Sequence, residues 1–158
     1  MRLHLTYREP AFPPAIIDLT KRFMELKPSK PYTPITVFNI WAHGASLCFE
    51  TTEVDVVFKR HPEGIGNYVP ETATSIAMIE LHKPSMISLF HNFRHHLQAH
   101  SEFKYESSEH EGQDAQAWAC SLYYVCNPQQ FRKAVRRDFI AGVGPSDLLK
   151  KSKKRGTK

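Results

Sequence analysis

The stretch that decides the fold is a strand that leads into a histidine-bearing helix, residues 75–100, SIAMIELHKPSMISLFHNFRHHLQAH. The segment 75–81 is short and mostly apolar, which favours a strand. Residues 84–100 have helical periodicity, with an apolar stripe at spacings of three and four that marks the core face. The members of that stripe are Met86, Phe90, Phe93 and Leu97.

The sequence outward from this stretch predicts further strands before it and further helices after it. Before it we expect a short strand at 3–7, a helix at 14–27, strands at 35–41, 46–50 and 54–59, a turn at Gly44 and a loop at 60–74. After it we expect a loop at 101–111, a helix at 113–125 and a helix at 128–141 with Asn127 as its N-cap. The predicted fold is therefore α+β: an N-terminal helix, a three- to four-stranded mixed sheet, the histidine-bearing helix and C-terminal helices.

The composition is that of one ordered globular domain. Of the 158 residues, 41% are hydrophobic and 23% are charged, a balance typical of a folded chain. We expect a single domain over residues 1–142 and a basic, disordered tail over 143–158. The three cysteines, Cys48, Cys120 and Cys126, form no CxxC pair, which indicates buried free thiols rather than disulfides or a thiolate zinc site.

The histidine spacing suggests a metal site. His91 and His95 are four residues apart, so they share a helix face and can bind one metal ion together. His96 and His100 form a second such pair that flanks the core stripe. A third ligand is expected from the next helix, where Asp114 is the first candidate and Glu111 the alternative; an acid at the start of a helix can equally serve the helix dipole.

With a strand, a histidine-bearing helix and a later acidic residue in this order, the sequence resembles the small zincin-like metallopeptidases of the ImmA/IrrE type, a family found in mobile elements and stress regulators. In that family a strand leads into a helix that carries HExxH, and a later helix supplies an acidic ligand. Here the matching segments are SIAMIEL, HNFRH at residues 91–95 and DAQAWA at residues 114–119. The resemblance implies a Zn²⁺ ion held by His91, His95 and Asp114, and a peptide or protein as substrate or partner.

One position departs from the family's motif. The general base of that family is the Glu that follows the first His, and here Asn92 occupies the position. An amide cannot take a proton from bound water and pass it to a leaving amine. We therefore expect hydrolysis to be impaired unless another base, with Glu111 the nearest candidate, replaces it.

The charge distribution suggests a different function, nucleic-acid binding. Residues 129–158 carry ten Lys and Arg against two acids, a net charge of +8, whereas residues 1–128 carry −3. A basic end of this kind can neutralise phosphates, although basic tails are also common as solvated segments. The residues concerned are Arg132, Lys133, Arg136, Arg137, Lys150, Lys151, Lys153 and Lys154.

The sequence contains no sign of a membrane segment. No apolar run approaches the roughly 18 residues of a membrane span, and the first residues lack the apolar core of a signal peptide. We therefore expect a cytoplasmic protein without a membrane partner. His43, in the segment WAHG, is expected in a turn from which it could enter a site on the sheet side.

Overall fold

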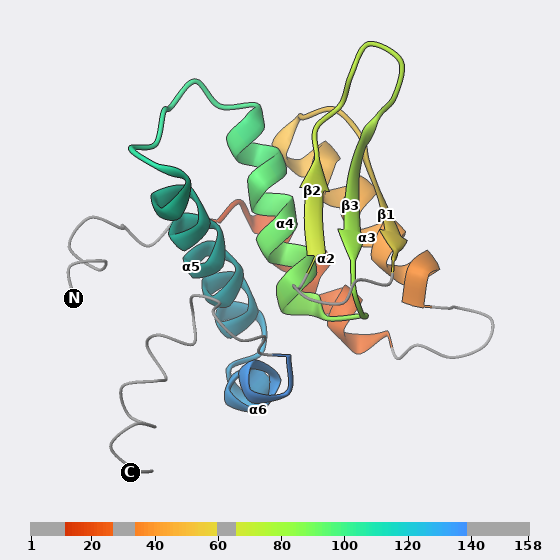
Figure 1. Ribbon diagram of the computed structural model, residues 1–158. Coiled ribbons are helices and arrows are strands. Elements are labelled where there is room, and N and C mark those ends of the chain that lie inside the picture. The colour runs from red at the N-terminus through yellow and green to blue at the C-terminus, as the bar shows by residue number, and fades with distance from the viewer. Residues whose placement is uncertain (1–11, 27–33, 60–65, 139–158) are drawn as a thin grey trace.

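The computed structural model describes residues 12–26, 34–59 and 66–138, with side chains up to residue 134. The predicted strand at 3–7 and the predicted tail at 143–158 lie outside these residues. Within them the chain forms an α+β fold, as predicted, with five helices and one mixed sheet (Figure 1). The elements are α2 (Pro14–Glu25), α3 (Pro34–Phe49), β1 (Val54–Phe58), β2 (Gly66–Val69), β3 (Ala77–Leu81), α4 (Met86–Ala99), α5 (Ser108–Cys126) and α6 (Pro128–Asp138).

The sheet has the strand order β1-β3-β2, so β3 is its central strand. β1 pairs with β3 in parallel, with Val56 opposite Ile79, and β2 pairs with β3 antiparallel, with Tyr68 opposite Ile79. α4 lies between α5 and the β2–β3 part of the sheet, while α3 packs along β1 (Figure 1). The histidine-bearing helix is therefore held on both sides.

An aromatic cluster forms the centre of the core. Trp41 is fully buried, and its ring centroid lies 4.9 Å from that of Phe90 and 5.2 Å from that of Phe93. Its indole N–H donates to the hydroxyl of Thr20 on α2 at 3.0 Å. Helices α2, α3 and α4 meet at this residue, and Phe90 and Phe93 confirm the predicted core face of α4.

The predicted strands at 35–41 and 46–50 were wrong, because residues 34–49 form the single helix α3. The β-branched and aromatic composition favoured strands. The buried residues nevertheless recur at helical spacing: Val37, Phe38, Trp41, Ala42 and Ala45. Gly44 is accordingly not a turn but a contact point, since a Cβ there would lie 3.0 Å from a methyl group of Leu19 on α2.

The predicted loop at 60–74 was wrong in part, because residues 66–69 form the edge strand β2. This strand is short and begins at Gly66, which gives it little strand signal in the sequence. Gly66 has a φ of 150°, and a Cβ on it would lie 2.7 Å from the carbonyl oxygen of Glu80. The close pairing of β2 with β3 therefore requires glycine here.

The remaining elements agree with the sequence apart from their ends. The strands at 54–59 and 75–81 and the helices at 14–27 and 84–100 are confirmed. Helix α5 begins at Ser108 rather than 113, because the Ser107 hydroxyl accepts from the His110 backbone N–H at 3.1 Å and caps the helix.

The three cysteines are free, as predicted, but half-buried rather than buried.

Candidate metal centre

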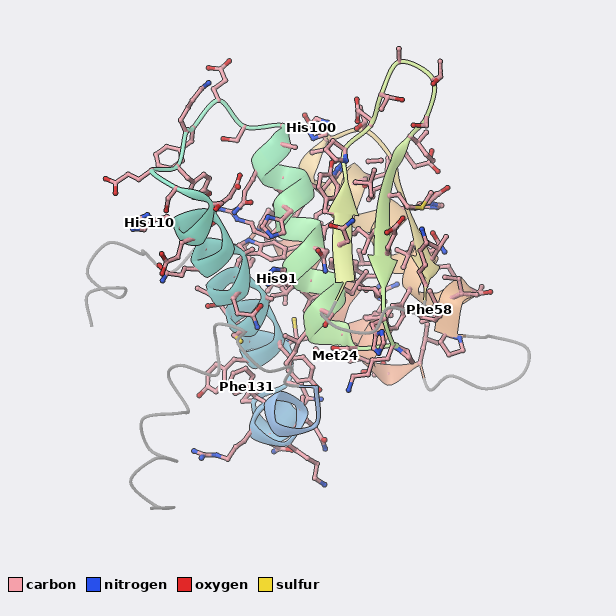
Figure 2. All side chains as sticks on the ribbon, viewed as in Figure 1. Met24, Phe58, His91, His100, His110 and Phe131 are labelled. Atoms are coloured by element: carbon pink, nitrogen blue, oxygen red, sulfur yellow. The ribbon has the colours of Figure 1, made fainter. Side chains whose placement is uncertain are left out.

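His91 lies on the face of α4 that is turned toward α5 (Figure 2), where it contacts Gln116. The ring of His95 lies beside that of His91. Their ring centroids are 4.9 Å apart. Helix α4 is fixed at its start by Ser85, whose hydroxyl accepts from the Ser88 backbone N–H at 3.1 Å. The sequence correctly predicted that these two histidines share one face.

Each of the two imidazoles uses Nδ1 to contact a glutamine oxygen. His91 Nδ1 makes a short hydrogen bond with Oε1 of Gln116, a buried residue of α5. His95 Nδ1 lies 2.7 Å from Oε1 of Gln98. Because an amide oxygen only accepts, each ring donates from Nδ1, and the Nε2 lone pair of each ring is left as the basic site.

Further hydrogen bonds of Gln98 fix the orientation of its amide. Its Nε2 donates to the backbone oxygen of Glu111 at 2.9 Å and to Oδ2 of Asp114 at 2.9 Å. Both partners are acceptors, so the NH₂ group must face them and the oxygen must face His95. The tautomer of His95 is thus set by residues of α5.

Asp114 is held by three donors and contacts His95 only through Gln98. Its Oδ2 accepts from Arg94 Nε at 2.8 Å, from Gln98 Nε2 at 2.9 Å and from the Tyr105 hydroxyl at 2.8 Å. Burial alone would raise the pKa of Asp114, but the hydrogen bonds from Arg94 and Gln98 and the charge of Arg94 lower it overall. The structure therefore places this carboxylate as an ionised link between α4 and α5.

Glu111 lies in the first turn of α5, where its backbone oxygen accepts the bond from Gln98. Within the described part of the chain, His91 and His95 belong to no set of three His, Cys, Asp or Glu side chains whose donor atoms all lie within 4.8 Å of one another. Neither Asp114 nor Glu111 therefore completes a three-ligand set in this arrangement, and His91 and His95 are the candidate ligands at this interface.

Asn92 is buried and turned away from the histidine pair. Only 2% of its surface is exposed, and its side-chain Nδ2 donates to the backbone oxygen of Ser88 at 2.9 Å. A Cβ on Gly66 would lie 3.2 Å from the same nitrogen, so Asn92 packs beneath the edge strand β2. The residue at the position of the family's general base thus has a packing role here.

The electrostatics keep His91 neutral. Burial, together with the neighbouring His95, lowers the pKa of His91 to about 4, and the bond to Gln116 offsets only part of this shift. At neutral pH the His91 ring is therefore uncharged. An uncharged imidazole is the form that binds metal ions.

The second histidine pair is committed to structural contacts. His96 is fully buried; its Nε2 donates to the Thr52 backbone oxygen at 2.8 Å, and its Nδ1 accepts from the Tyr68 hydroxyl at 2.7 Å. His100 uses Nδ1 to donate to the His96 backbone oxygen at 2.9 Å. His96 therefore has no free nitrogen for a ligand.

Of the predicted basic residues, the structure describes the side chains of Arg132 and Lys133. Both are exposed on α6, while Phe131 and Ala134 of the same helix pack against the core. The side chains of Arg136, Arg137, Lys150, Lys151, Lys153 and Lys154 lie outside the described residues.

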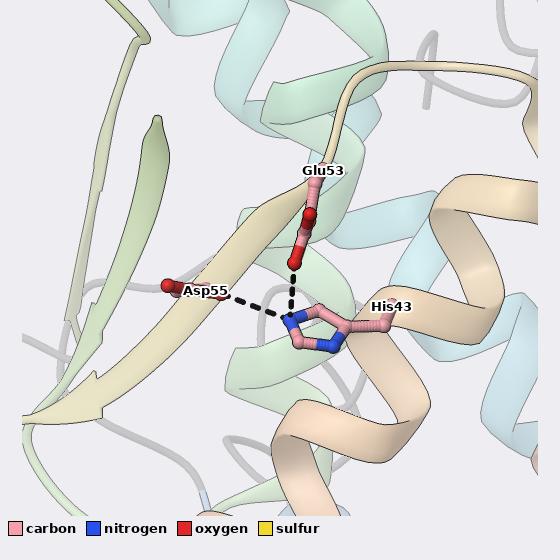
Figure 3. A group of neighbouring side chains, drawn as sticks. All are labelled: His43, Glu53 and Asp55. Carbon is pink, nitrogen blue, oxygen red and sulfur yellow. Dashed lines mark hydrogen bonds and ion pairs between the residues drawn. The ribbon is translucent and has the colours of Figure 1, made fainter. Parts of the chain in front are cut away.

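The sequence reasoning missed two features that only the structure brings together. Gln116 lies within the segment DAQAWA, but its contact with His91 depends on how α5 packs on α4. His43 lies on helix α3 rather than in a turn, and it contacts the carboxylates of Glu53, just before β1, and of Asp55, on β1 (Figure 3). No local pattern connects residues in different elements in this way.

Comparison with known proteins found no matching family model, no similar curated protein and no similar solved structure. The resemblance to zincin-like peptidases therefore remains a prediction. Among the described residues, no helix combines the length and apolar character needed to cross a bilayer.

Proposed function

We propose that this protein is a zinc-binding, metallopeptidase-like protein with impaired hydrolysis, in which His91 and His95 hold the metal. One observation carries the proposal: both rings direct Nδ1–H to a glutamine oxygen and keep Nε2 available. Histidine ligands of metals usually donate their other N–H to such an acceptor, which fixes the tautomer and orients the ring. Bound zinc would supply Lewis-acid polarisation of a ligand oxygen.

The order of elements also supports this proposal. A strand, β3, leads into the helix that carries the histidine pair, and the next helix supplies Gln116 and Asp114. In the proposed site these residues act behind the ligands, with Gln116 and Gln98 orienting the rings and Asp114 holding Gln98. A peptide or protein segment is the proposed substrate or partner.

Impaired hydrolysis follows from the chemistry of Asn92. An amide has no accessible protonation change, and this one is buried and bonded to the Ser88 oxygen. A positioned general base typically contributes about 10²–10⁴-fold in rate. We therefore expect peptide cleavage to be lower by about this factor than in a zincin that carries the glutamate.

The experiment is a zinc titration of the untagged full chain by calorimetry, beside His91→Ala and His95→Ala. Either substitution should weaken zinc binding by at least about tenfold, the loss typical even of residues behind a metal ligand. His110→Ala is the matched control, because His110 is 54% exposed at the side chain and bonded to Ser107. Equal zinc affinity in wild type and both variants would refute the proposal.

A second candidate function, nucleic-acid binding, is favoured by the exposed basic residues of α6. Arg132 and Lys133 face solvent on a helix whose opposite face is packed against the core. If they contact phosphates, Arg132→Ala with Lys133→Ala should reduce the slope of log affinity against log salt by about two, because each duplex phosphate contact contributes about 0.9. Binding that does not depend on salt would exclude this candidate.

A further inference from the structure

A second group of metal-ligand side chains lies at the edge of the sheet, away from the α4–α5 interface. His43 extends from α3, and its Nε2 lies 2.9 Å from Oδ1 of Asp55 on β1 and 3.3 Å from Oε2 of Glu53, just before that strand (Figure 3). Among the described residues, this group is the one whose His, Asp and Glu donor atoms all lie within 4.8 Å of one another.

The backbone around this group is fixed by Asn39, one helical turn before His43. Asn39 Nδ2 donates to the Val56 backbone oxygen at 2.9 Å, and Asn39 Oδ1 accepts from the Val56 N–H at 2.8 Å. This pair of bonds clamps α3 against the outer edge of β1. Because Asp55 directly precedes Val56, the clamp also sets the position of His43 relative to Asp55.

The two carboxylates converge because of strand geometry. Residues two apart along an extended segment point to the same side, so Glu53 and Asp55 share one side of the chain. Val54 and Val56 point the other way and are buried. Burial of the valines thus holds both carboxylates on the side of the chain where they contact His43.

The spacing of the donors suits a metal ion. Zinc bonds to histidine nitrogen and carboxylate oxygen are about 2.0–2.2 Å long, so at angles of about 90–110° neighbouring donors lie about 3.0–3.5 Å apart. The two observed separations, 2.9 and 3.3 Å, are close to this range. One divalent cation would also neutralise the two carboxylates, which otherwise lie close to each other.

We propose that His43, Glu53 and Asp55 form a second cation site, which takes a divalent first-row transition-metal ion such as Zn²⁺. The imidazole nitrogen favours such an ion over Mg²⁺ or Ca²⁺, which prefer an all-oxygen set. The side chains are 43%, 58% and 37% exposed, so an ion can enter directly from solvent and complete its coordination with water. This site stands independently of the one proposed on α4.

The test is zinc stoichiometry by calorimetry on the full chain with His91→Ala and His95→Ala in place, so that the α4 site is absent. We expect one zinc per chain, and a loss of affinity of at least about tenfold on adding Glu53→Gln, Asp55→Asn or His43→Ala. Asp18→Asn is the matched control, because Asp18 is an exposed carboxylate that pairs with Arg22. Mg²⁺ should bind more weakly than Zn²⁺.

The two proposals fail separately in this design. Zinc that binds to the background protein but with equal affinity in the Glu53, Asp55 and His43 variants would overturn the second site, as would no binding at millimolar zinc. If the background substitutions prevent folding, the single Glu53→Gln and Asp55→Asn variants of the otherwise unchanged chain should each bind one zinc fewer than wild type. If only the proposed α4 site is wrong, the wild-type protein should bind one zinc. The Glu53→Gln and Asp55→Asn variants should then bind none.

Discussion

At the scale of single residues, two glutamines decide the chemical state of the histidine pair. Gln116 and Gln98 accept from the Nδ1 atoms of His91 and His95, and Gln98 is itself oriented by Asp114. A neutral amide can therefore determine which nitrogen of a histidine is available. The residue pattern HNFRH alone does not contain this information.

Replacing Gln98 should show how much the orientation of the His95 ring contributes to zinc binding, because His95 itself is kept. In Gln98→Met the side chain keeps its length, but His95 loses its acceptor and can rotate or change tautomer. We expect zinc affinity at the α4 site to fall by about 10–100-fold, the usual effect of residues behind a ligand. Tyr105→Phe is the control, because it removes a different bond to Asp114 and leaves the Gln98–His95 contact intact. Calorimetry that finds equal affinities in the two variants would contradict this role of Gln98.

The pKa of His91 predicts a loss of stability in acid. The pKa is about 4 in the folded protein against an unfolded value of 6.5, so the unfolded chain binds more protons between these values. The unfolding free energy therefore carries no penalty from His91 above pH 6.5. It falls as the pH drops toward 4, and this group lowers it by up to on the order of 3 kcal/mol. His91→Gln should flatten the pH dependence of urea unfolding in chelator-treated protein. An unchanged pH profile would contradict the prediction.

At the scale of elements, a few local interactions set where helices and strands begin. Ser85 and Ser107 cap α4 and α5 through the backbone N–H groups of Ser88 and His110. The Asn39 side chain hydrogen-bonds to both the N–H and the carbonyl oxygen of Val56, and it thereby covers the free edge of β1. Edge strands need such protection, because their unpaired groups otherwise invite pairing with other chains.

Two glycines should respond in opposite ways to the same substitution. Gly66→Ala forces a side chain onto a residue with φ of 150° and within 2.7 Å of the Glu80 oxygen, and should cost about 1–3 kcal/mol of unfolding free energy. Gly112 lies in α5 with nothing within 4 Å of an added Cβ, so Gly112→Ala should gain up to about 1 kcal/mol. Urea denaturation measures both, and a neutral Gly66→Ala would show that β2 tolerates a side chain.

At the scale of the whole molecule, one aromatic core joins the helices to each other. Trp41 contacts Phe23 of α2 and Phe90 and Phe93 of α4, and its N–H is satisfied by Thr20. Because α4 carries the histidine pair, the stability of this core also determines how firmly the proposed α4 site is held. The core and the site are therefore coupled through α4.

Removing Trp41 should destabilise the entire domain. Trp41→Ala is expected to cost about 3–5 kcal/mol, the usual range for a buried large aromatic residue. The remaining tryptophan, Trp118, provides the fluorescence signal for urea unfolding. Leu47→Ala on the same helix is the control, because Leu47 is 80% exposed and its loss should change stability by less than about 0.5 kcal/mol. A similar cost for both variants would place the core elsewhere.

The sequence by itself determined the features that depend on neighbours along the chain. It predicted the strand at 75–81 followed by the histidine-bearing helix, the shared face of His91 and His95, and the α+β class, because periodicity and capping are local properties. It failed at residues 35–49, where β-branched and aromatic residues favour strands although their burial has helical spacing. It also failed at β2, whose four residues carry almost no strand pattern.

The tertiary structure alone decided which side chains meet. Asp114 is bonded to Arg94, Gln98 and Tyr105, and His43 meets Glu53 and Asp55, because of how α5 packs on α4 and α3 packs on β1. A carboxylate bonds to whichever donors the packing brings within reach, and packing is driven by the burial of apolar residues elsewhere. Residue types therefore indicate which chemistry is available, and the packed elements decide where it is assembled.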